Sequence, residues 1–154
     1  MSTDRIVYTG AYLDVGKIKV KYEMTINGCP NCKTGNNRNK FCSSCGHEHV
    51  DYQKPAQASS FNELLDVASS NGIIDDAEYD DIIDTFFTDY TFIMPEGGPE
   101  NVGQTHWVGY ETLEFQMPVV DNIAAQAFFQ PVLTLLDHFG IKYEMKTGIL
   151  YYCR

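Results

Sequence analysis

The stretch GCPNCKTGNNRNKFCSSCGHEH, residues 28–49, carries four of the five cysteines of this 154-residue chain. They form two C-x-x-C pairs, Cys29 with Cys32 and Cys42 with Cys45, separated by nine residues. Two residues between paired cysteines let one tight turn direct both sulfurs to a common point, and two such turns complete a tetrahedron of thiolates. The spacing therefore predicts a metal site that organises this part of the chain.

Other uses of paired cysteines fit this stretch less well. A thioredoxin-like redox pair needs one C-x-x-C at a helix start beside a βαβ unit, whereas both pairs here lie in turn-rich sequence. The N-terminus shows no charged leader followed by an apolar run, so we expect a chain in the reducing cytoplasm, where disulfides are disfavoured. An iron site shares the ligand type and stays open beside zinc. Four thiolates leave no open coordination position, so we expect one structural ion.

CPNC followed by KFCSSCGHEH resembles the zinc-ribbon family, whose second knuckle commonly reads Phe-Cys-x-x-Cys-Gly. The resemblance covers residues 28–49 only, and none that we can name extends over residues 55–154. It implies that the zinc ligands are Cys29, Cys32, Cys42 and Cys45. Zinc ribbons occur in transcription factors, ribosomal proteins, enzymes and adaptors, so the resemblance fixes no single function.

The segments on either side of the cysteines indicate strands. Residues 17–26 alternate between apolar and polar side chains, which is typical of a half-buried strand with a basic outer face. The β-forming residues before it, broken by Gly10 and Gly16, predict a strand that turns back onto it. HEHVDYQ, residues 47–53, predicts a strand that pairs with the end of the first. We therefore expect residues 1–54 to form a β-hairpin and a four-cysteine zinc ribbon.

Pro55 and the small polar residues after it mark a boundary, and three helical segments are predicted beyond it. The first follows Ser60 as N-cap, and the second follows Asp75, with Glu78 in a capping-box position. The third follows Asp121 and ends at Gly140, with Pro131 kinking or restarting it. The apolar stripe expected for the second helix consists of Tyr79, Ile82, Ile83, Phe86 and Phe87.

Four strands complete the second part. Residues 88–95 and 105–118 read as strands separated by a glycine- and proline-rich loop, and residues 141–154 read as a hairpin around Lys146-Thr147-Gly148. Residues 55–154 thus predict an acidic α+β domain in the order α-α-β-β-α-β-β. Short turns between strands favour an antiparallel sheet with helices on one face. The predicted fold class is α+β, an N-terminal β-hairpin and zinc-ribbon module followed by this antiparallel-sheet domain.

The chain has a net charge of −10, which argues against a protein that coats nucleic acid through bulk positive charge. Residues 17–54 nevertheless carry seven basic and three acidic side chains, and residues 55–154 carry three basic and sixteen acidic ones. Candidate phosphate-binding cations are Lys17, Lys19, Lys21, Lys33, Arg38 and Lys40. No aromatic residue alternates with these lysines on the same face, so the sequence does not indicate base stacking. A solvated strand face with a polar loop explains the same residues equally well.

Acidic side chains gather in the second predicted helix. They are Asp75, Asp76, Glu78, Asp80, Asp81 and Asp84. Such a cluster is usually an exposed helix face. A dense carboxylate surface can also imitate a phosphate backbone and occupy a nucleic-acid-binding partner.

We predict a non-enzymatic, regulatory binding or adaptor protein whose partner is macromolecular, and the family resemblance favours nucleic-acid-handling machinery. An acidic, DNA-mimicking inhibitor competes with this and would suit a small phage or mobile-element protein. A third hypothesis is an enzyme with a site around residues 96–107, where His106 adjoins Trp107, although no nucleophile motif accompanies them. No apolar run approaches the roughly 20 residues of a membrane span, and no small-molecule substrate is indicated.

Overall fold

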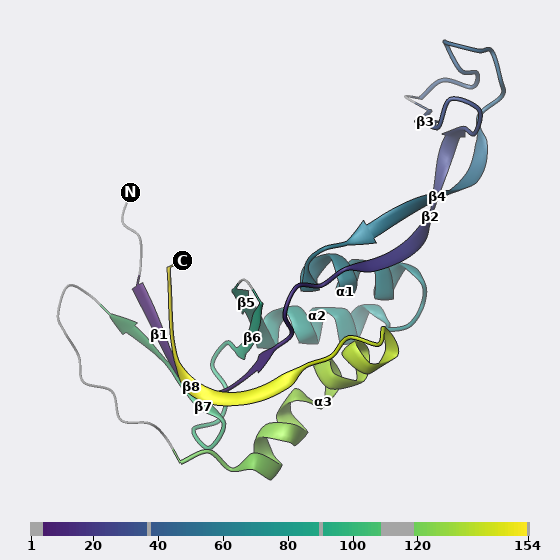
Figure 1. Cartoon of the computed structure of the whole chain (residues 1–154). Helices are drawn as coiled ribbons and strands as arrows, with labels where there is room; N and C mark the ends of the chain where they lie inside the picture. The colour runs from purple at the N-terminus through teal and green to yellow at the C-terminus, as the bar shows by residue number, and fades with distance from the viewer. Residues whose placement is uncertain (1–4, 37, 90, 109–118, 154) are drawn as a thin grey trace. The chain divides into compact units, whose positions relative to one another are not determined.

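The computed structural model describes residues 5–36, 38–89, 91–108 and 119–153 of the chain. The contacts divide the chain into two compact units, residues 19–59 and residues 1–18 together with 60–154. The fold class is α+β, with antiparallel sheets and three helices in the described part (Figure 1).

The unit at residues 19–59 is an antiparallel ribbon. Strand β2 (Val20–Cys29) pairs with β4 (Val50–Ala58), and the short strand β3 (Thr34–Gly35) pairs with the end of β2. The strand expected after the cysteines therefore pairs as predicted. It continues through Pro55, because β4 lies at an edge of the sheet order β3-β2-β4, where a residue without an N–H group is tolerated.

Strand β1 (Arg5–Asp14) is the central strand of the other unit. On one side it pairs along its whole length with β8 (Glu144–Cys153). On the other side its first part pairs with β7 (Gly103–Val108) and its last two residues pair with β6 (Phe92–Pro95). Strand β5 (Phe86–Asp89) extends the sheet beyond β6, and all of these pairings are antiparallel.

The structure differs from the sequence predictions for the strands nearest the two ends of the sequence. The N-terminal strand does not turn back onto the next one, because its partners are β6, β7 and β8. The residues expected to turn at Lys146-Thr147-Gly148 continue as one strand, with Thr147 opposite Ala11 and Gly148 opposite Gly10. A ladder along a buried central strand outweighs the local turn preference of one glycine.

These pairings also shift the boundary expected between residues 54 and 55. Strand β4 runs to Ala58, and strand β1 belongs with residues 60–154. The composition of the sequence changes near Pro55, but backbone pairing does not stop there. A division of the chain into two functional domains stays a prediction.

The predicted helix starts agree with the structure. Helix α1 (Phe61–Ser70) is capped by Ser60, whose Oγ accepts a hydrogen bond from the backbone N–H of Glu63 at 3.2 Å. Helix α2 (Asp76–Thr85) is capped by Asp75, whose Oδ1 accepts from the N–H of Glu78 at 2.7 Å. These caps satisfy N–H groups that have no partner within the helix.

Helix α3 (Asn122–His138) is one continuous helix that contains Pro131. Asp121 caps its start by accepting hydrogen bonds from two backbone N–H groups, and Gly140 follows its end with a φ of +67°. Both ends were predicted. None of the helices in the described part of the chain is long and apolar enough to cross a membrane.

Phe86 and Phe87 do not belong to the apolar stripe of the second helix, because α2 ends at Thr85. Both lie on β5, where Phe87 is opposite Met94 on β6. Phe86 contacts the ring of Phe129 on α3, with 5.4 Å between the ring centroids. Successive side chains of a strand point to opposite faces of its sheet, so the two rings belong to different layers.

The sheet buries side chains on both faces. One face packs against helices, as the contact between Phe86 and α3 shows, and Ile6, Tyr8 and Met94 form a buried cluster elsewhere in the same unit. Gly103 makes room for the Tyr8 ring, since a Cβ at this position would lie 2.1 Å from the Tyr8 hydroxyl oxygen. The strand expected at residues 105–118 is described only as far as Val108, and the rest lies outside the described residues.

Candidate metal centre

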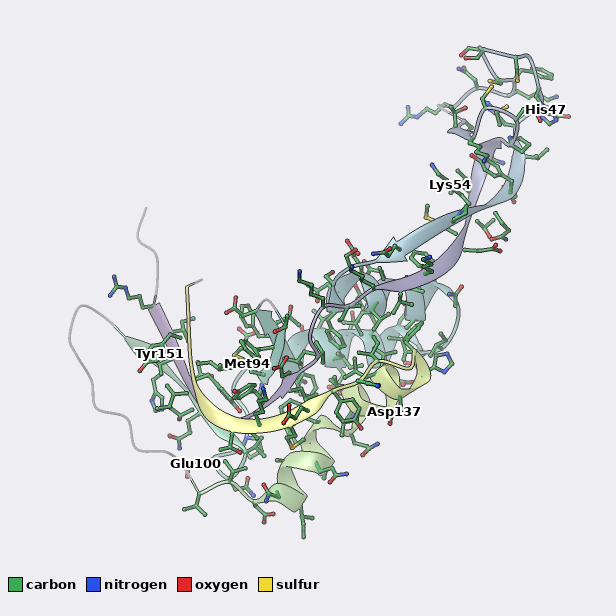
Figure 2. The ribbon with its side chains drawn as sticks, viewed as in Figure 1. His47, Lys54, Met94, Glu100, Asp137 and Tyr151 are labelled. Carbon is green, nitrogen blue, oxygen red and sulfur yellow. The ribbon has the colours of Figure 1, made fainter. Side chains whose placement is uncertain are left out.

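The four cysteines of the two C-x-x-C pairs lie on two turns at one end of the ribbon. Cys29 is the last residue of β2, and Cys32 follows it in a turn. Cys42 and Cys45 lie in a second turn, closed by an isolated antiparallel bridge between Phe41 and Glu48. Figure 2 shows the sulfur atoms in these loops, with His47 beside them.

All four sulfur atoms lie within 4.8 Å of one another. The Sγ atoms of Cys29 and Cys45 are 3.4 Å apart, and those of Cys32 and Cys42 are 3.8 Å apart. Ligands placed about 2.3 Å from a central zinc ion in a tetrahedron would be about 3.8 Å from each other. The spacing of the sulfurs therefore fits a tetrahedral metal ion, and the cluster could hold one.

The two turns share a backbone feature. The residue after the second cysteine of each pair has a positive φ, +56° at Lys33 and +76° at Gly46. In the second turn, the N–H of Gly46 donates to the carbonyl of Cys42 at 2.8 Å. In the first, the N–H of Cys32 donates to Sγ of Cys29 at 3.4 Å. Left-handed backbone after each pair turns the chain away so that both sulfurs point inward.

Electrostatics in the cluster favours a cation. Backbone amides of Cys45 and Ser44 hydrogen-bond to Cys42 and lower its thiol pKa to about 6. Hydrogen bonds with the thiols of Cys45, Cys42 and Cys29 raise the pKa of Cys32 to about 12. Sulfurs this close together cannot all become thiolates unless a positive charge offsets their repulsion. A divalent ion between them would supply that charge.

A chain of hydrogen bonds ties the loop between the cysteine pairs to the ribbon. Asn27 Nδ2 donates to Asp51 Oδ1 at 2.9 Å, and Asn36 Nδ2 donates to Asn27 Oδ1 at 2.7 Å. Asn36 Oδ1 accepts from the N–H of Arg38 at 3.0 Å, where φ is +66°. The sequence suggested only a polar, turn-rich tip. The run of asparagines was the available signal, because their side chains stabilise turns and left-handed backbone.

The candidate cations are all exposed, but they do not form one row. Three of them lie between the two cysteine pairs, and Lys21 lies on β2. Two precede the strand, because β2 begins at Val20 and not at residue 17. The six residues are Lys17, Lys19, Lys21, Lys33, Arg38 and Lys40.

The acidic candidates lie together on α2. Asp75 caps the helix, and the remaining side chains are exposed along it. Asp76, Asp80 and Asp84 follow one another at intervals of four residues and so share a face. Glu78 and Asp81 lie three residues apart on the same helix.

His106, the centre of the enzyme hypothesis, lies on β7 opposite Val7. Its Nε2 is 3.4 Å from Oγ1 of Thr9. Thr9 is fully buried, so a substrate cannot reach this hydroxyl. The contact between His106 and Thr9 is therefore part of the packing of the sheet. The side chain of Trp107 lies outside the described residues.

Phe41 is a surface feature that the sequence indicated only as part of the knuckle signature. The Phe41 side chain is 52% exposed and precedes Cys42 directly. Lys40 Nζ lies 5.6 Å from the centre of the ring. A phenylalanine between a lysine and a metal-site cysteine was the available signal.

The ribbon and its sulfur cluster define a protein with a four-cysteine site that could bind a metal ion. No family model, no curated protein and no solved structure matches the chain.

Proposed function

We propose that the chain is a non-enzymatic adaptor protein whose ribbon is a zinc ribbon, held by one structural zinc ion. The observation that carries this proposal is the cluster of four sulfurs within 4.8 Å of one another. Four thiolates fill the coordination of Zn²⁺ and leave no position for water or substrate. The ligands would be Cys29, Cys32, Cys42 and Cys45.

The small core of the ribbon unit supports a structural role for the ion. Among its described residues, the buried apolar side chains are Cys29, Cys42 and Ala58. A two-stranded ribbon is marginally stable in water, and small units without a core usually need a disulfide or a metal. A zinc ion would join the turn after β2 to the turn before β4. Thiolate ligands persist in a reducing compartment, so we propose a cytoplasmic location.

We propose that the ribbon engages a macromolecular partner that handles nucleic acid. Residues 19–59 carry six basic and three acidic side chains, whereas the other unit carries five basic and eighteen acidic ones. Four thiolates and one Zn²⁺ add a charge of −2, so the ribbon unit stays positive. Opposite charge on a partner increases the rate of encounter and fixes orientation.

The exposed carboxylates of α2 support a second candidate function. Asp76, Asp80 and Asp84 repeat along one face of the helix. This spacing could offer negative charge to a protein that normally binds a phosphate backbone. The chain would then be an acidic, regulatory inhibitor of the kind a phage or mobile element uses.

Native mass spectrometry of the purified chain tests the metal proposal. We expect a mass shift of one zinc ion per chain, lost when Cys42→Ser and Cys45→Ser are combined. Cys153→Ser is the matched control, because Cys153 belongs to neither C-x-x-C pair, and this variant should retain the ion. A folded chain that carries no metal, or that carries iron, would refute the zinc assignment.

Affinity purification from the native cell, repeated with two charge variants, separates the two candidate functions. Lys19→Glu with Lys21→Glu should remove the partners of a zinc-ribbon adaptor. Neutralising α2 through Asp76→Asn, Asp80→Asn and Asp84→Asn should leave these partners in place, and Asp75 is kept because it caps the helix. The reverse pattern would favour the inhibitor over the adaptor.

A further inference from the structure

Phe41 presents an aromatic ring to solvent at the metal end of the ribbon. Half of its side chain is exposed although it adjoins the buried residue Cys42. Lys40 Nζ is 5.6 Å from the ring centroid, within the range of a cation–π contact. Single exposed apolar residues are common on protein surfaces, so exposure of the Phe41 ring alone does not indicate a binding site. The residues around the ring have to supply that indication.

The surroundings of Phe41 are basic. Lys33, Arg38 and Lys40 are exposed, and residues 33–42 include no acidic residue. Across the bridge from Phe41 lies Glu48, an exposed carboxylate that partly offsets this charge. An aromatic face beside several cations suits a ligand that offers both a flat π surface and phosphates.

The backbone around Phe41 is held in place before any ligand binds. The N–H of His49 donates to the carbonyl of Lys40 at 2.9 Å, and the N–H of Cys42 donates to the carbonyl of His47 at 2.8 Å. The N–H of Asn39 donates to the carbonyl of Asn36 at 2.8 Å. Backbone that is already held in this way does not have to be ordered on binding, which favours affinity.

We propose that Phe41 is a stacking platform for an unpaired base, and that Arg38 and Lys40 contact the neighbouring phosphates of a single strand. This deepens the proposed function and rests on it, because the metal would fix Cys42 and hence the ring next to it. Bases in a duplex stack on each other and hide their faces, whereas single strands expose them to aromatic side chains. Stacking accepts every base, so the site binds single-stranded nucleic acid with little sequence preference.

Fluorescence anisotropy with the zinc-loaded full chain tests this inference. The probe is a fluorescein-labelled oligothymidylate of about 12 nucleotides, within the length bound by common single-strand sites. We expect Phe41→Ala to weaken binding roughly 5- to 150-fold, the range that one lost base stack corresponds to. Phe41→Trp should retain binding, and its indole fluorescence should be quenched when a base stacks on it.

Salt dependence tests the two cations separately from the ring. Each phosphate contact contributes about 0.7 to the slope of log affinity against log salt for a single strand. Arg38→Gln and Lys40→Gln should each lower the slope by about that amount, whereas Phe41→Ala should leave the slope unchanged. A duplex of the same sequence should bind more weakly than the single strand.

Met24→Ala is the matched control, because Met24 is an exposed apolar side chain of the same ribbon, on β2. It should bind the probe as the natural chain does, and the zinc content of every variant confirms that the ribbon is intact. Equal affinity of Phe41→Ala and the natural chain, or no binding by the natural chain, overturns the inference. If the variant that combines Lys19→Glu and Lys21→Glu still loses its protein partners in that case, the adaptor proposal survives without this inference.

Discussion

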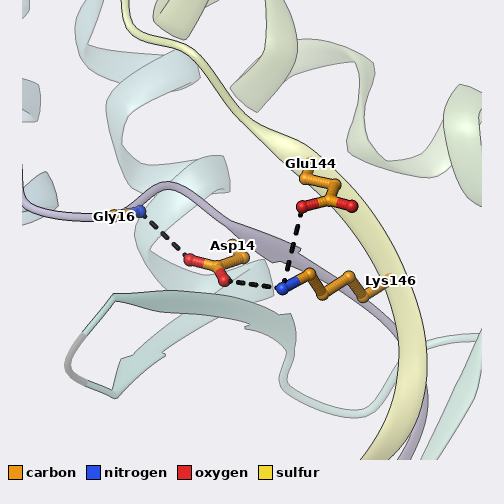
Figure 3. A network of polar contacts seen from close by, with 4 residues as sticks. All are labelled: Asp14, Gly16, Glu144 and Lys146. Atoms are coloured by element: carbon orange, nitrogen blue, oxygen red, sulfur yellow. Dashed lines mark hydrogen bonds and ion pairs between the residues drawn. The ribbon is translucent and has the colours of Figure 1, made fainter.

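The carboxylate of Asp14 accepts a hydrogen bond from Nζ of Lys146 at 3.0 Å, although the residues are 132 positions apart in the sequence (Figure 3). Asp14 Oδ1 also accepts the N–H of Gly16 at 3.1 Å. Lys146 lies 3.7 Å from Glu144 as well. The contact joins the end of β1 to β8, and it holds the pKa of Asp14 below its ordinary value, with the Lys146 hydrogen bond as the largest cause.

Asp14→Asn should lower the free energy of unfolding by about 0.5–1 kcal/mol at neutral pH. A carboxyl group whose pKa is lower in the folded state stabilises the fold at pH values above its unfolded pKa of 3.8. This contribution to stability disappears as the pH falls through the folded pKa. Urea unfolding at neutral pH and at about pH 2 measures this. Glu144→Gln is the control and should change little, since Glu144 is 73% exposed. A difference that stays the same in acid would exclude the charge as its origin.

Gly103→Ala should destabilise the sheet unit by about 1–3 kcal/mol through overpacking. The added Cβ would lie 2.1 Å from the hydroxyl oxygen of Tyr8 and 2.5 Å from its Cζ, and the Tyr8 ring is buried. Gly35→Ala is the control, because nothing lies within 4 Å of its Cβ position. Thermal unfolding followed by near-UV circular dichroism gives the comparison.

A double-mutant cycle with Tyr8→Phe identifies the cause of the Gly103→Ala effect. Removing the hydroxyl relieves the shortest contact, so Gly103→Ala should cost less in the Tyr8→Phe background than in the natural chain. Additive effects of the two substitutions would show that the hydroxyl is not the obstacle.

Removing the proposed zinc ion with a chelator should disorder residues 19–59 and leave the other unit folded. The sheet unit has its own core, which includes Leu64, Ile93 and Phe129, whereas the ribbon unit has almost none. Amide signals in two-dimensional NMR spectra report both units at once. The zinc affinity should decrease as the pH is lowered, because protons compete with the metal for the thiolates. If the ribbon signals stay dispersed without metal, the ribbon does not need the ion to fold.

The two positive-φ residues after the cysteine pairs should respond differently to substitution. Gly46→Ala should weaken zinc binding by about 1–2 kcal/mol, because a side chain in left-handed backbone is strained. Lys33→Gly should leave the zinc affinity unchanged or raise it, since that strain is already present in the natural chain. Competition with a chromogenic chelator measures both affinities. Equal losses at the two positions would contradict the argument from backbone strain.

Local signals in the sequence predicted local structure well. Ser60, Asp75 and Asp121 cap helices because a short polar side chain before an apolar helical pattern acts on its own neighbours. The C-x-x-C spacing likewise predicted that the two sulfurs of each pair lie close together, since each pair needs only one tight turn. These features depend on residues a few positions apart.

Features that depend on distant partners could not be predicted in the same way. The local sequence around Gly148 favours a turn, and only its pairing with Gly10 shows that it lies in a strand. The local pattern likewise places Phe86 in a helix, and only the fold brings it against Phe129. The partners of β1 all lie far along the chain, and no local pattern names them. Phe41 was missed for another reason, because its exposure depends on how the metal turn is built.

The ladder between β1 and β8, which places Arg5 opposite Cys153, also sets an order of events on the ribosome. Among the described strands, β1 is translated before its full-length partner β8, and all the other strands lie between them in the sequence. The ribbon needs only residues 19–59 and can close much earlier. A nascent chain would therefore carry a folded ribbon while the apolar side chains of β1 are not yet covered by β8. Translation that stalls before β8 would leave β1 exposed to chaperones.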